Sequence, residues 1–429
     1  MRKTRRIFII AFLLCIFIYC LKVDSIPKSI ILYGGEQLNL GNFLGISLNI
    51  EGKDCKTILA SSEIPSNSDS GKKEATVDVK LFNTINVKEV SVSIIDKTTV
   101  IPVGQVSGLK LYTSGVLVVG MSEIKGEDNQ KHKPYEQSGI EEGDRIIKIN
   151  SEEITDTNSL INIVNNSRGQ NLEIEYVRNG AMQNASITPI KYTDGTYKLG
   201  LWVRDSAAGI GTLTFYEPST GNFAALGHGI TDSDTGGLVE IQNGEFLTTK
   251  ILSIIKGAKG NPGKIQGTIE NGTTIGNIYK NSNLGIYGTV SNLSGINADL
   301  SKEMEVARRD EISLGEATIY CNLNESSGNN ISENNYAQAK EYKIEIEKIF
   351  INNDTNNKSM LIKVKDPELL EKTGGIIQGM SGSPVIQNGK FVRCCYQCAS
   401  KWPYTRICCF WRYNAKGNEG GLIVTIHSY

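Results

Sequence analysis

The chain has 429 residues, more than one hydrophobic core ordinarily serves, so we expect two or three folded units. Its 45 basic residues nearly balance its 46 acidic ones, and 39% of all residues are hydrophobic. That hydrophobic content supports several cores. A near-neutral chain without a long basic block lacks the surface that nucleic acid binds, so we expect no nucleic-acid partner.

The N-terminus combines basic residues with a long apolar run over residues 7–21. The basic residues before the run are Arg2, Lys3, Arg5 and Arg6. This pattern is an export signal, and its length lies between that of a signal-peptide core and that of a membrane span. Because residues 23–25 form a poor cleavage site, we predict an uncleaved signal anchor over residues 1–24, with the rest of the chain exported and held at the membrane.

Residues 30–105 are expected to form a β-rich N-terminal region. The segment Thr76–Leu81 alternates apolar and polar residues at period two, which predicts a half-buried strand. We assign no chemistry to this region.

Residues 108–190 show a more specific series of turns and strands. A loop at residues 113–115 opens into an apolar strand, and Ile146–Ile149 forms a second strand after a glycine-flanked turn. Asp156 is the expected N-cap of a short helix, and Asn179-Gly180 is a hairpin turn signal. The predicted apolar face of the helix consists of Leu160, Ile161, Ile163 and Val164.

This series resembles a PDZ domain, an α+β module that binds an extended peptide by adding it to a strand edge. The resemblance implies that the loop-proximal backbone captures a terminal carboxylate. The residues of that predicted peptide-binding loop are Ser114, Gly115, Val116 and Leu117. The alternative is a spacer domain whose groove binds nothing.

Residues 195–429 are rich in glycine and in short apolar runs, without long helical periodicity. This profile predicts an antiparallel barrel or sandwich. The segments Tyr342–Ile351 and Met360–Val364 are expected to be neighbouring strands. The predicted fold class is therefore mostly β.

The strongest chemical motif is the string from Gly379 to Pro384, Gly-Met-Ser-Gly-Ser-Pro. A serine between glycines on a tight turn allows the backbone N–H groups of Gly379 and Ser381 to point at one spot, as an oxyanion hole requires. The string resembles the nucleophile loop of chymotrypsin-like peptidases. The alternative is a purely structural turn.

A serine nucleophile needs a base and an orienting carboxylate. Of the three histidines, His132 lies in a charged loop and His427 in an unusual tail, whereas His228 stands between two glycines, so we predict His228 as the base. Asp232 and Asp234 follow His228 too closely to reach its far ring nitrogen. Asp366, fifteen residues before Ser381, is the predicted third member.

Two blocks, residues 226–229 and 366–384, resemble the stage IV sporulation signalling serine peptidase family. The resemblance implies a chymotrypsin-like double β-barrel peptidase with the catalytic residues His228, Asp366 and Ser381, and neither metal nor organic cofactor. It also implies export across the forespore inner membrane, to an anchored or secreted form in the intermembrane space. There the enzyme would cleave itself and a membrane regulator of the metalloprotease that activates a late sigma factor.

The C-terminal tail departs from this pattern after Val392. Five of the nine cysteines fall within sixteen residues, namely Cys394, Cys395, Cys398, Cys408 and Cys409. Codons for this tail can be chosen so that a shift of one nucleotide yields an alternating, hairpin-like string, so we predict that residues 393–429 are frameshifted. As written, the barrel would then lose a strand pair. The alternative is a zinc site that uses Cys395, Cys398, Cys408 and Cys409.

Two other functional hypotheses remain open. The first is a catalytically dead, PDZ-containing binding or scaffold protein, which the aberrant tail favours. The second is a β-rich binding protein in which the glycine motifs are only turns.

Overall fold

The computed structural model describes residues 97–397 except 259–260, 270–271, 309–310, 325–337 and 351–359, together with short segments between residues 24 and 95 and the strand Thr405–Cys409. Its contacts divide the chain into two compact units, and the boundary along the chain lies between Thr98 and Thr99. Each unit is described separately below.

The N-terminal unit contains a sheet with the strand order β1-β7-β6-β3-β4. Alternation in β6 buries Val77 and Val79, as the period-two pattern predicts. The strand predicted at Thr76–Leu81 is therefore confirmed. The strands of this unit are β1 (Ser29–Tyr33), β2 (Gln37–Leu38), β3 (Ile46–Ile50), β4 (Lys53–Cys55), β5 (Ile58–Leu59), β6 (Lys73–Leu81) and β7 (Ile85–Ile95).

The predicted anchor run, residues 7–21, lies outside the described residues. Among the helices that are described, none has both the length and the apolar character needed to cross a bilayer.

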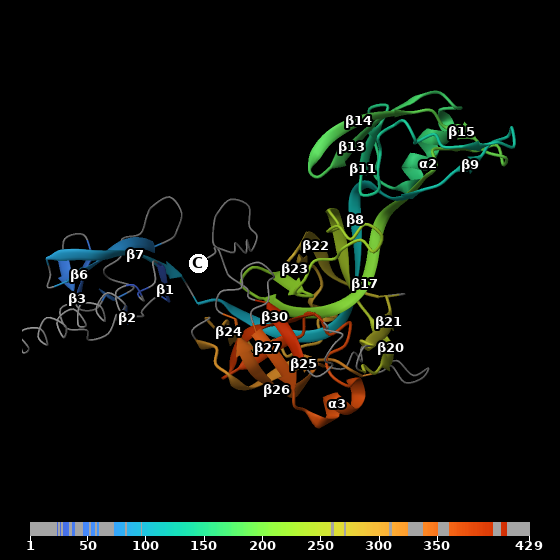
Figure 1. Ribbon diagram of the computed structural model, residues 1–429. Coiled ribbons are helices and arrows are strands. Elements are labelled where there is room, and N and C mark those ends of the chain that lie inside the picture. The colour runs from blue at the N-terminus through green and yellow to red at the C-terminus, as the bar shows by residue number, and fades with distance from the viewer. Residues whose placement is uncertain are drawn as a thin grey trace, which may run out of the picture. The chain divides into compact units, whose positions relative to one another are not determined.

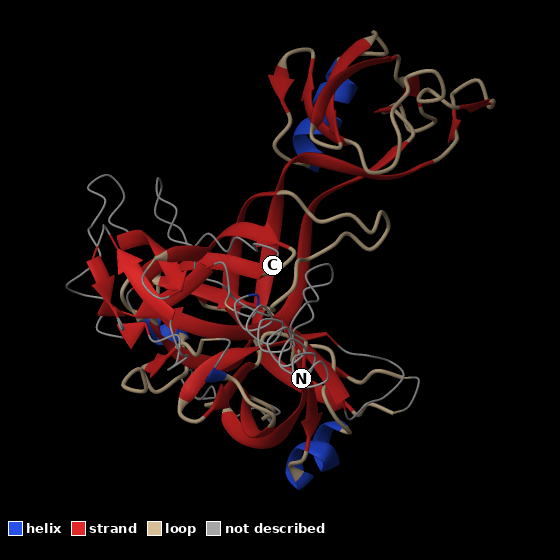
Figure 2. Ribbon diagram, turned by 60° about the vertical axis from the view of Figure 1, so that its left-hand side comes forward, coloured by secondary structure: helices blue, strands red, loops and turns tan. Residues whose placement is uncertain are grey.

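The second unit is organised around two long antiparallel strands, β8 (Thr99–Met121) and β17 (Leu201–Glu217). They pair from Leu201↔Met121 to Tyr216↔Ile101, and the residues between them fold as a separate α+β lobe (Figures 1 and 2). The same two strands therefore run through this lobe and through the β-domain below it. The lobe that contains the predicted PDZ region thus lies along the chain between two strands that also belong to the β-domain.

The inserted lobe packs a short sheet against helix α2 (Thr157–Asn166). Asp156 caps this helix through a capping box, and Asn179 and Gly180 both have positive φ between β13 and β14, so both local predictions are confirmed. Ile161, predicted on the apolar face, is 46% exposed because that face is centred on the buried Leu160 and Val164. The strands are β9 (Ile124–Lys125), β10 (Lys131–His132), β11 (Arg145–Ile149), β12 (Glu152–Glu153), β13 (Leu172–Arg178), β14 (Ala181–Ile187), β15 (Ile190–Lys191) and β16 (Tyr197–Lys198).

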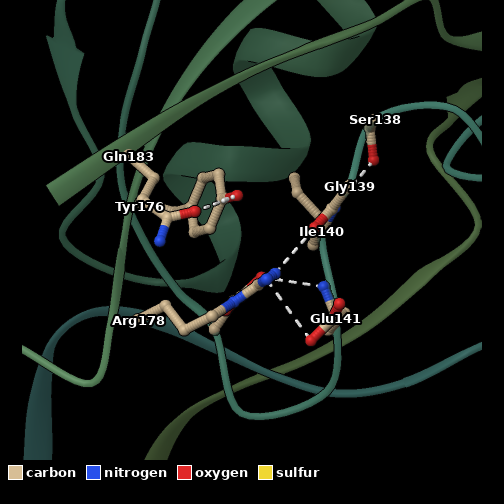
Figure 3. Close-up of polar contacts among 8 residues, drawn as sticks. Ser138, Gly139, Ile140, Glu141, Tyr176, Arg178 and Gln183 are labelled. Atoms are coloured by element: carbon tan, nitrogen blue, oxygen red, sulfur yellow. Dashed lines mark hydrogen bonds and ion pairs between the residues drawn. The ribbon is translucent and has the colours of Figure 1, made fainter. Parts of the chain in front are cut away.

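An ion pair with a buried carboxylate stabilises the turn before β11. The guanidinium of Arg178 donates through Nε and Nη2 to the two carboxylate oxygens of Asp144, each at 2.6 Å, and Nη2 also reaches the Gly139 carbonyl (Figure 3). The Asp144 side chain is only 2% exposed, and it also accepts the Glu141 backbone N–H at 2.7 Å. Arg178 thus ties the end of β13 to the turn that leads into β11.

The lower part of the second unit contains two closed rings of strands. In the first, β8 pairs with β17 and with β19, and the order β17-β18-β23-β22-β19 completes the ring. The second is the closed barrel β25-β26-β27-β30-β29-β28. The strands are β18 (Asn222–Ala225), β19 (Ile241–Thr248), β20 (Lys250–Ile255), β21 (Lys264–Thr268), β22 (Thr274–Ser282), β23 (Gly285–Val290), β24 (Met304–Glu305), β25 (Gly315–Cys321), β26 (Lys340–Ile349), β27 (Met360–Val364), β28 (Pro384–Gln387), β29 (Lys390–Gln397) and β30 (Thr405–Cys409); the helices are η1 (Leu293–Gly295) and α3 (Pro367–Thr373).

The tail as written takes part in the second barrel. Strand β29 pairs with β28. Strand β30 closes the ring by pairing with β29 and with β27, beside which it lies in Figure 1. The loss of a strand pair that we expected from the altered tail is not seen, because strand pairing uses the backbone and tolerates the changed side chains. The frameshift itself stays a prediction.

Candidate active site

The nucleophile loop lies between α3 and β28. Gly379 and Gly382 have φ values of 95° and 98°, a region that favours glycine, and the buried Met380 anchors the loop. Of its two serines, Ser383 is completely buried, whereas Ser381 is only partly buried. Ser381 is therefore the hydroxyl that a substrate can reach.

Two backbone hydrogen bonds hold the shape of this loop. The Met380 N–H donates to the Ile377 carbonyl at 3.2 Å, and the Ser383 N–H donates to the Met380 carbonyl at 3.0 Å. Both hydrogen bonds lie within the loop that carries Gly379 and Ser381, the two predicted oxyanion donors.

His228 lies in a tight turn directly after β18. Leu226 and Gly227 have φ values of 69° and 71°, and the Leu226 side chain occupies space that a Cβ at Gly211 would fill. The Nδ1 atom of His228 lies 2.9 Å from the Gly229 carbonyl oxygen. Since a carbonyl only accepts, Nδ1 carries the proton in this contact and Nε2 is the basic nitrogen of the neutral ring.

The serine and histidine loops touch each other. A Cβ at Gly382 would clash with the Thr212 carbonyl oxygen and would lie 2.5 Å from the Leu226 nitrogen. Thr212 also accepts the Leu226 N–H at 3.1 Å and donates its own N–H to the Ser381 carbonyl at 3.0 Å. The structure therefore brings the loops of Ser381 and His228 together, across the two strand rings.

Asp366 is placed differently from the other two predicted catalytic residues. It is the N-cap of α3, where Oδ1 accepts the N–H groups of Glu368 at 3.0 Å and Leu369 at 3.2 Å, and Oδ2 accepts the Lys343 N–H at 3.3 Å. Among the described residues, Asp366 makes no hydrogen bond to His228. Its catalytic role stays a prediction from the resemblance.

The two carboxylates nearer to His228 in the sequence are held by Arg204 of β17. The guanidinium forms ion pairs with Asp232, whose side chain is 2% exposed, and with Asp234 at 2.7 Å. Burial raises the pKa of Asp232, but the backbone N–H groups of Thr235 and Asp234, together with Arg204, outweigh burial and hold the pKa below its ordinary value. These contacts fix the loop that follows His228.

Replacing Arg204 by methionine is expected to loosen this loop. The buried Asp232 would lose its cation, a change that costs about 2 kcal/mol, so amide exchange in residues 232–239 should accelerate roughly thirtyfold at pH 7. The folded-state pKa of Asp232 is depressed, so the ionic stabilisation is present above about pH 4 and is lost as the pH falls through that pKa. Hydrogen exchange measured at pH 7 and pH 3 checks this, and an equal difference between the two chains at both values would contradict it.

Sequence reasoning missed Thr212, the residue that joins the two loops. A signal was present, because Gly209 and Gly211 interrupt an apolar strand, and glycine inside a strand often marks a close backbone approach. The other histidines lie elsewhere. His132 contacts Asp128 at 2.8 Å, and His427 is outside the described residues.

The predicted peptide-binding loop does not have the open strand edge that we expected. Val116 and Leu117 pair with β11 on one side, and Leu117 and Val118 pair with β17 on the other. Within the described chain, β17 pairs only with β8 over Leu201–Arg204. Its other edge lies next to α2, where Asp205 accepts the Thr157 N–H at 2.8 Å.

The described residues contain no group of three or more His, Cys, Asp or Glu side chains that could hold a metal ion. The side chains of the alternative zinc ligands, namely Cys395, Cys398, Cys408 and Cys409, are outside the described part of the chain.

A serine and a histidine on touching loops, presented by strand rings, form an arrangement suited to acyl transfer. The comparison with protein families agrees with it. Residues 195–396 match the family described as SpoIVB peptidase S55, and residues 112–188 match the PDZ domain family. The chain therefore carries a SpoIVB peptidase S55 family domain together with a PDZ domain.

Two individual relatives cover smaller parts of the chain. A candidate zinc metalloprotease of Lactococcus lactis subsp. lactis is 29% identical over 102 residues, which are 24% of this chain and 22% of that protein. The chain thus spans about a fifth of the length of that curated relative. The crystal structure of the PDZ domain of an SdrC-like protein from Listeria monocytogenes is 21% identical and covers 21% of this chain and 87% of that one, with a TM-score of 0.17.

Proposed function

We propose that this chain is a serine endopeptidase of sporulation signalling that cleaves itself and a membrane regulator of the metalloprotease that processes a late sigma factor. The contact between the Ser381 and His228 loops is the observation that carries the proposal. The family match supports the reaction class, and the two strand rings are compatible with a chymotrypsin-like double barrel. The proposed location is the space outside the forespore inner membrane, with the N-terminal segment as anchor.

In the proposed reaction, Ser381 Oγ attacks the scissile carbonyl carbon while His228 Nε2 takes the hydroxyl proton. The N–H groups of Gly379 and Ser381 bind the oxyanion that forms. His228 then gives its proton to the leaving amine as the C–N bond breaks. Water, deprotonated by His228, attacks the acyl-enzyme; the ester bond to Ser381 breaks, His228 returns the proton to Ser381 Oγ, and the carboxylic acid is released.

Self-cleavage tests this proposal directly. The full-length chain and its Ser381→Ala variant are expressed in parallel, and their fragments are followed with time by mass spectrometry. We expect fragments only from the chain that keeps Ser381. An intact wild-type chain, or the same fragments from both chains, would favour the scaffold alternative.

The third catalytic residue is proposed to be Asp366. Asparagine caps helices as well as aspartate does, so Asp366→Asn keeps the α3 cap but removes the charge that would orient and stabilise the His228 imidazolium. We expect kcat to fall about 10⁴-fold while the thermal unfolding midpoint stays within a few degrees. Unchanged hydrolysis by a folded Asp366→Asn chain would leave Asp366 with the helix-cap role alone.

A second proposed function belongs to the PDZ domain. Because both edges of Val116–Val118 are paired, an extended peptide would add to the outer edge of Leu201–Arg204, beside α2. Peptide titration monitored through Trp202, which is 64% exposed on this strand, tests the placement. Unchanged fluorescence during saturable binding would contradict this edge as the binding site.

A further inference from the structure

Thr212 contacts both catalytic loops from the middle of β17. The residue is completely buried. Its N–H donates to the Ser381 carbonyl at 3.0 Å, its hydroxyl donates to the Gly379 carbonyl at 2.7 Å, and its own carbonyl accepts the Leu226 N–H at 3.1 Å. One residue therefore uses its backbone and its side chain to connect the serine loop with the histidine loop.

The two carbonyls that Thr212 holds flank the catalytic peptide unit. The Gly379 carbonyl belongs to the peptide before Met380, and the Ser381 carbonyl belongs to the peptide after Ser381. The peptide between them carries the Ser381 N–H, one of the two proposed oxyanion donors. Because Gly379 has the conformational freedom of glycine at φ 95°, an anchor on its carbonyl restricts a turn that could otherwise rotate.

The same strand position restrains the histidine loop. Leu226, a non-glycine residue with φ 69°, precedes His228 by two positions and donates to the Thr212 carbonyl. A left-handed conformation at leucine persists only where its surroundings enforce it. Two contacts stabilise this conformation. The Leu226 side chain packs in the space beside Gly211, and the Leu226 N–H donates to the Thr212 carbonyl.

We propose that Thr212 is a positioning residue whose hydroxyl sets the orientation of the oxyanion-binding turn relative to His228. This inference rests on the proposed function of Ser381 and His228. The hydroxyl acts through Gly379 and touches neither substrate nor the reacting atoms. Its loss should slow attack by Ser381 without changing how a ligand is held before the reaction.

Phosphonylation of Ser381 by a fluorophosphonate tests the inference without a known substrate. In this reaction, Ser381 Oγ forms a bond to phosphorus, fluoride leaves, and the phosphoryl oxygen occupies the oxyanion site. Thr212→Val keeps the β-branched shape and both backbone hydrogen bonds but removes the hydroxyl. We expect the maximal inactivation rate to fall about 10- to 100-fold, with the inhibitor's half-saturating concentration within about twofold.

Two further variants separate positioning from folding. Thr212→Ser restores a hydroxyl and should recover most of the rate. Thr214 is also completely buried in β17, and its hydroxyl makes no hydrogen bond within the described residues, so Thr214→Val is a matched control that should react like the wild type. Rates are compared at a temperature where all chains are folded, as shown by thermal unfolding.

The outcomes distinguish the positioning role of Thr212 from the proposed catalytic function of Ser381 and His228. A wild-type chain that does not react at Ser381 would overturn the proposed function. If the wild-type chain reacts and the folded Thr212→Val chain is inactivated at the same rate per molecule, the positioning role of Thr212 is overturned and the proposed function is not. If Thr212→Val and Thr214→Val lower the inactivation rate equally, the effect comes from packing in β17, and the positioning role is also overturned.

Discussion

Replacing Ser381 by alanine is expected to lower kcat for hydrolysis of labelled casein by about four to six orders of magnitude. The alanine chain keeps the loop fold, because the contacts to Thr212 and Met380 use the backbone, but it lacks the Oγ nucleophile. His228→Ala should cost a similar factor. The double variant should lose little more than either single variant, because nucleophile and base act as one unit.

The matched control for this series is Ser383→Ala. Ser383 lies two residues away and is completely buried, and its hydroxyl makes no hydrogen bond within the described residues. Its replacement should leave hydrolysis within about twofold of the wild type, a margin that corresponds to less than 1 kcal/mol. Loss of activity with Ser383→Ala and retention with Ser381→Ala would show that the nucleophile had been assigned to the wrong serine.

Replacing Arg178 by methionine is expected to destabilise the PDZ domain by about 3–5 kcal/mol. The Asp144 carboxylate is 2% exposed and would keep the Glu141 N–H but lose both guanidinium hydrogen bonds. A domain of this size is stable by only about 5–15 kcal/mol, so the variant should approach local unfolding. Hydrogen exchange of β13 and β14 in the full chain measures this as a loss of protection.

An exposed pair in the same sheet provides the control. Lys148 and Glu175 lie 3.9 Å apart with side chains 37% and 31% exposed, so Lys148→Met should change the protection by less than about 1 kcal/mol. The double variant Asp144→Leu with Arg178→Met removes the buried charge together with its cation and should regain part of the loss. Equal effects of Arg178→Met and Lys148→Met would contradict the importance of the Arg178–Asp144 pair.

The local features of the PDZ domain could be predicted from the sequence. Asp156 at the start of α2 and Asn179-Gly180 between β13 and β14 are determined by neighbouring residues, and each took the predicted conformation. Leu160 and Ile161 are adjacent, so they cannot both lie at the centre of one helix face. The sequence does not show which of the two is buried; in the structure it is Leu160.

The long-range pairing could not be predicted. The first half of β8 belongs to the first ring of strands, and its second half belongs to the inserted lobe. The sequence suggests instead that the second half begins a new domain. The occupied edge of Val116–Val118 follows from the pairing with β17, some 85 residues further along the chain. For the same reason, Gly209 and Gly211 indicate a close backbone approach in this strand but do not indicate that Thr212 connects the serine loop with the histidine loop.

The sequence around Asp366 indicates two different roles for this residue. Aspartate before proline and glutamate is a helix-start pattern, and the structure shows this cap. The family resemblance separately assigns the residue to catalysis. The two roles involve the same carboxylate, so Asp366→Asn is the variant that separates them.

Mass spectrometry of the full-length chain after reaction with a fluorophosphonate tests the central claim most directly. We predict one covalent adduct, located on Ser381, that forms in the wild type and is absent from Ser381→Ala and strongly slowed in His228→Ala. A folded wild-type chain without the adduct, or an adduct that persists in Ser381→Ala, would contradict the assignment of Ser381 and His228 as the catalytic pair.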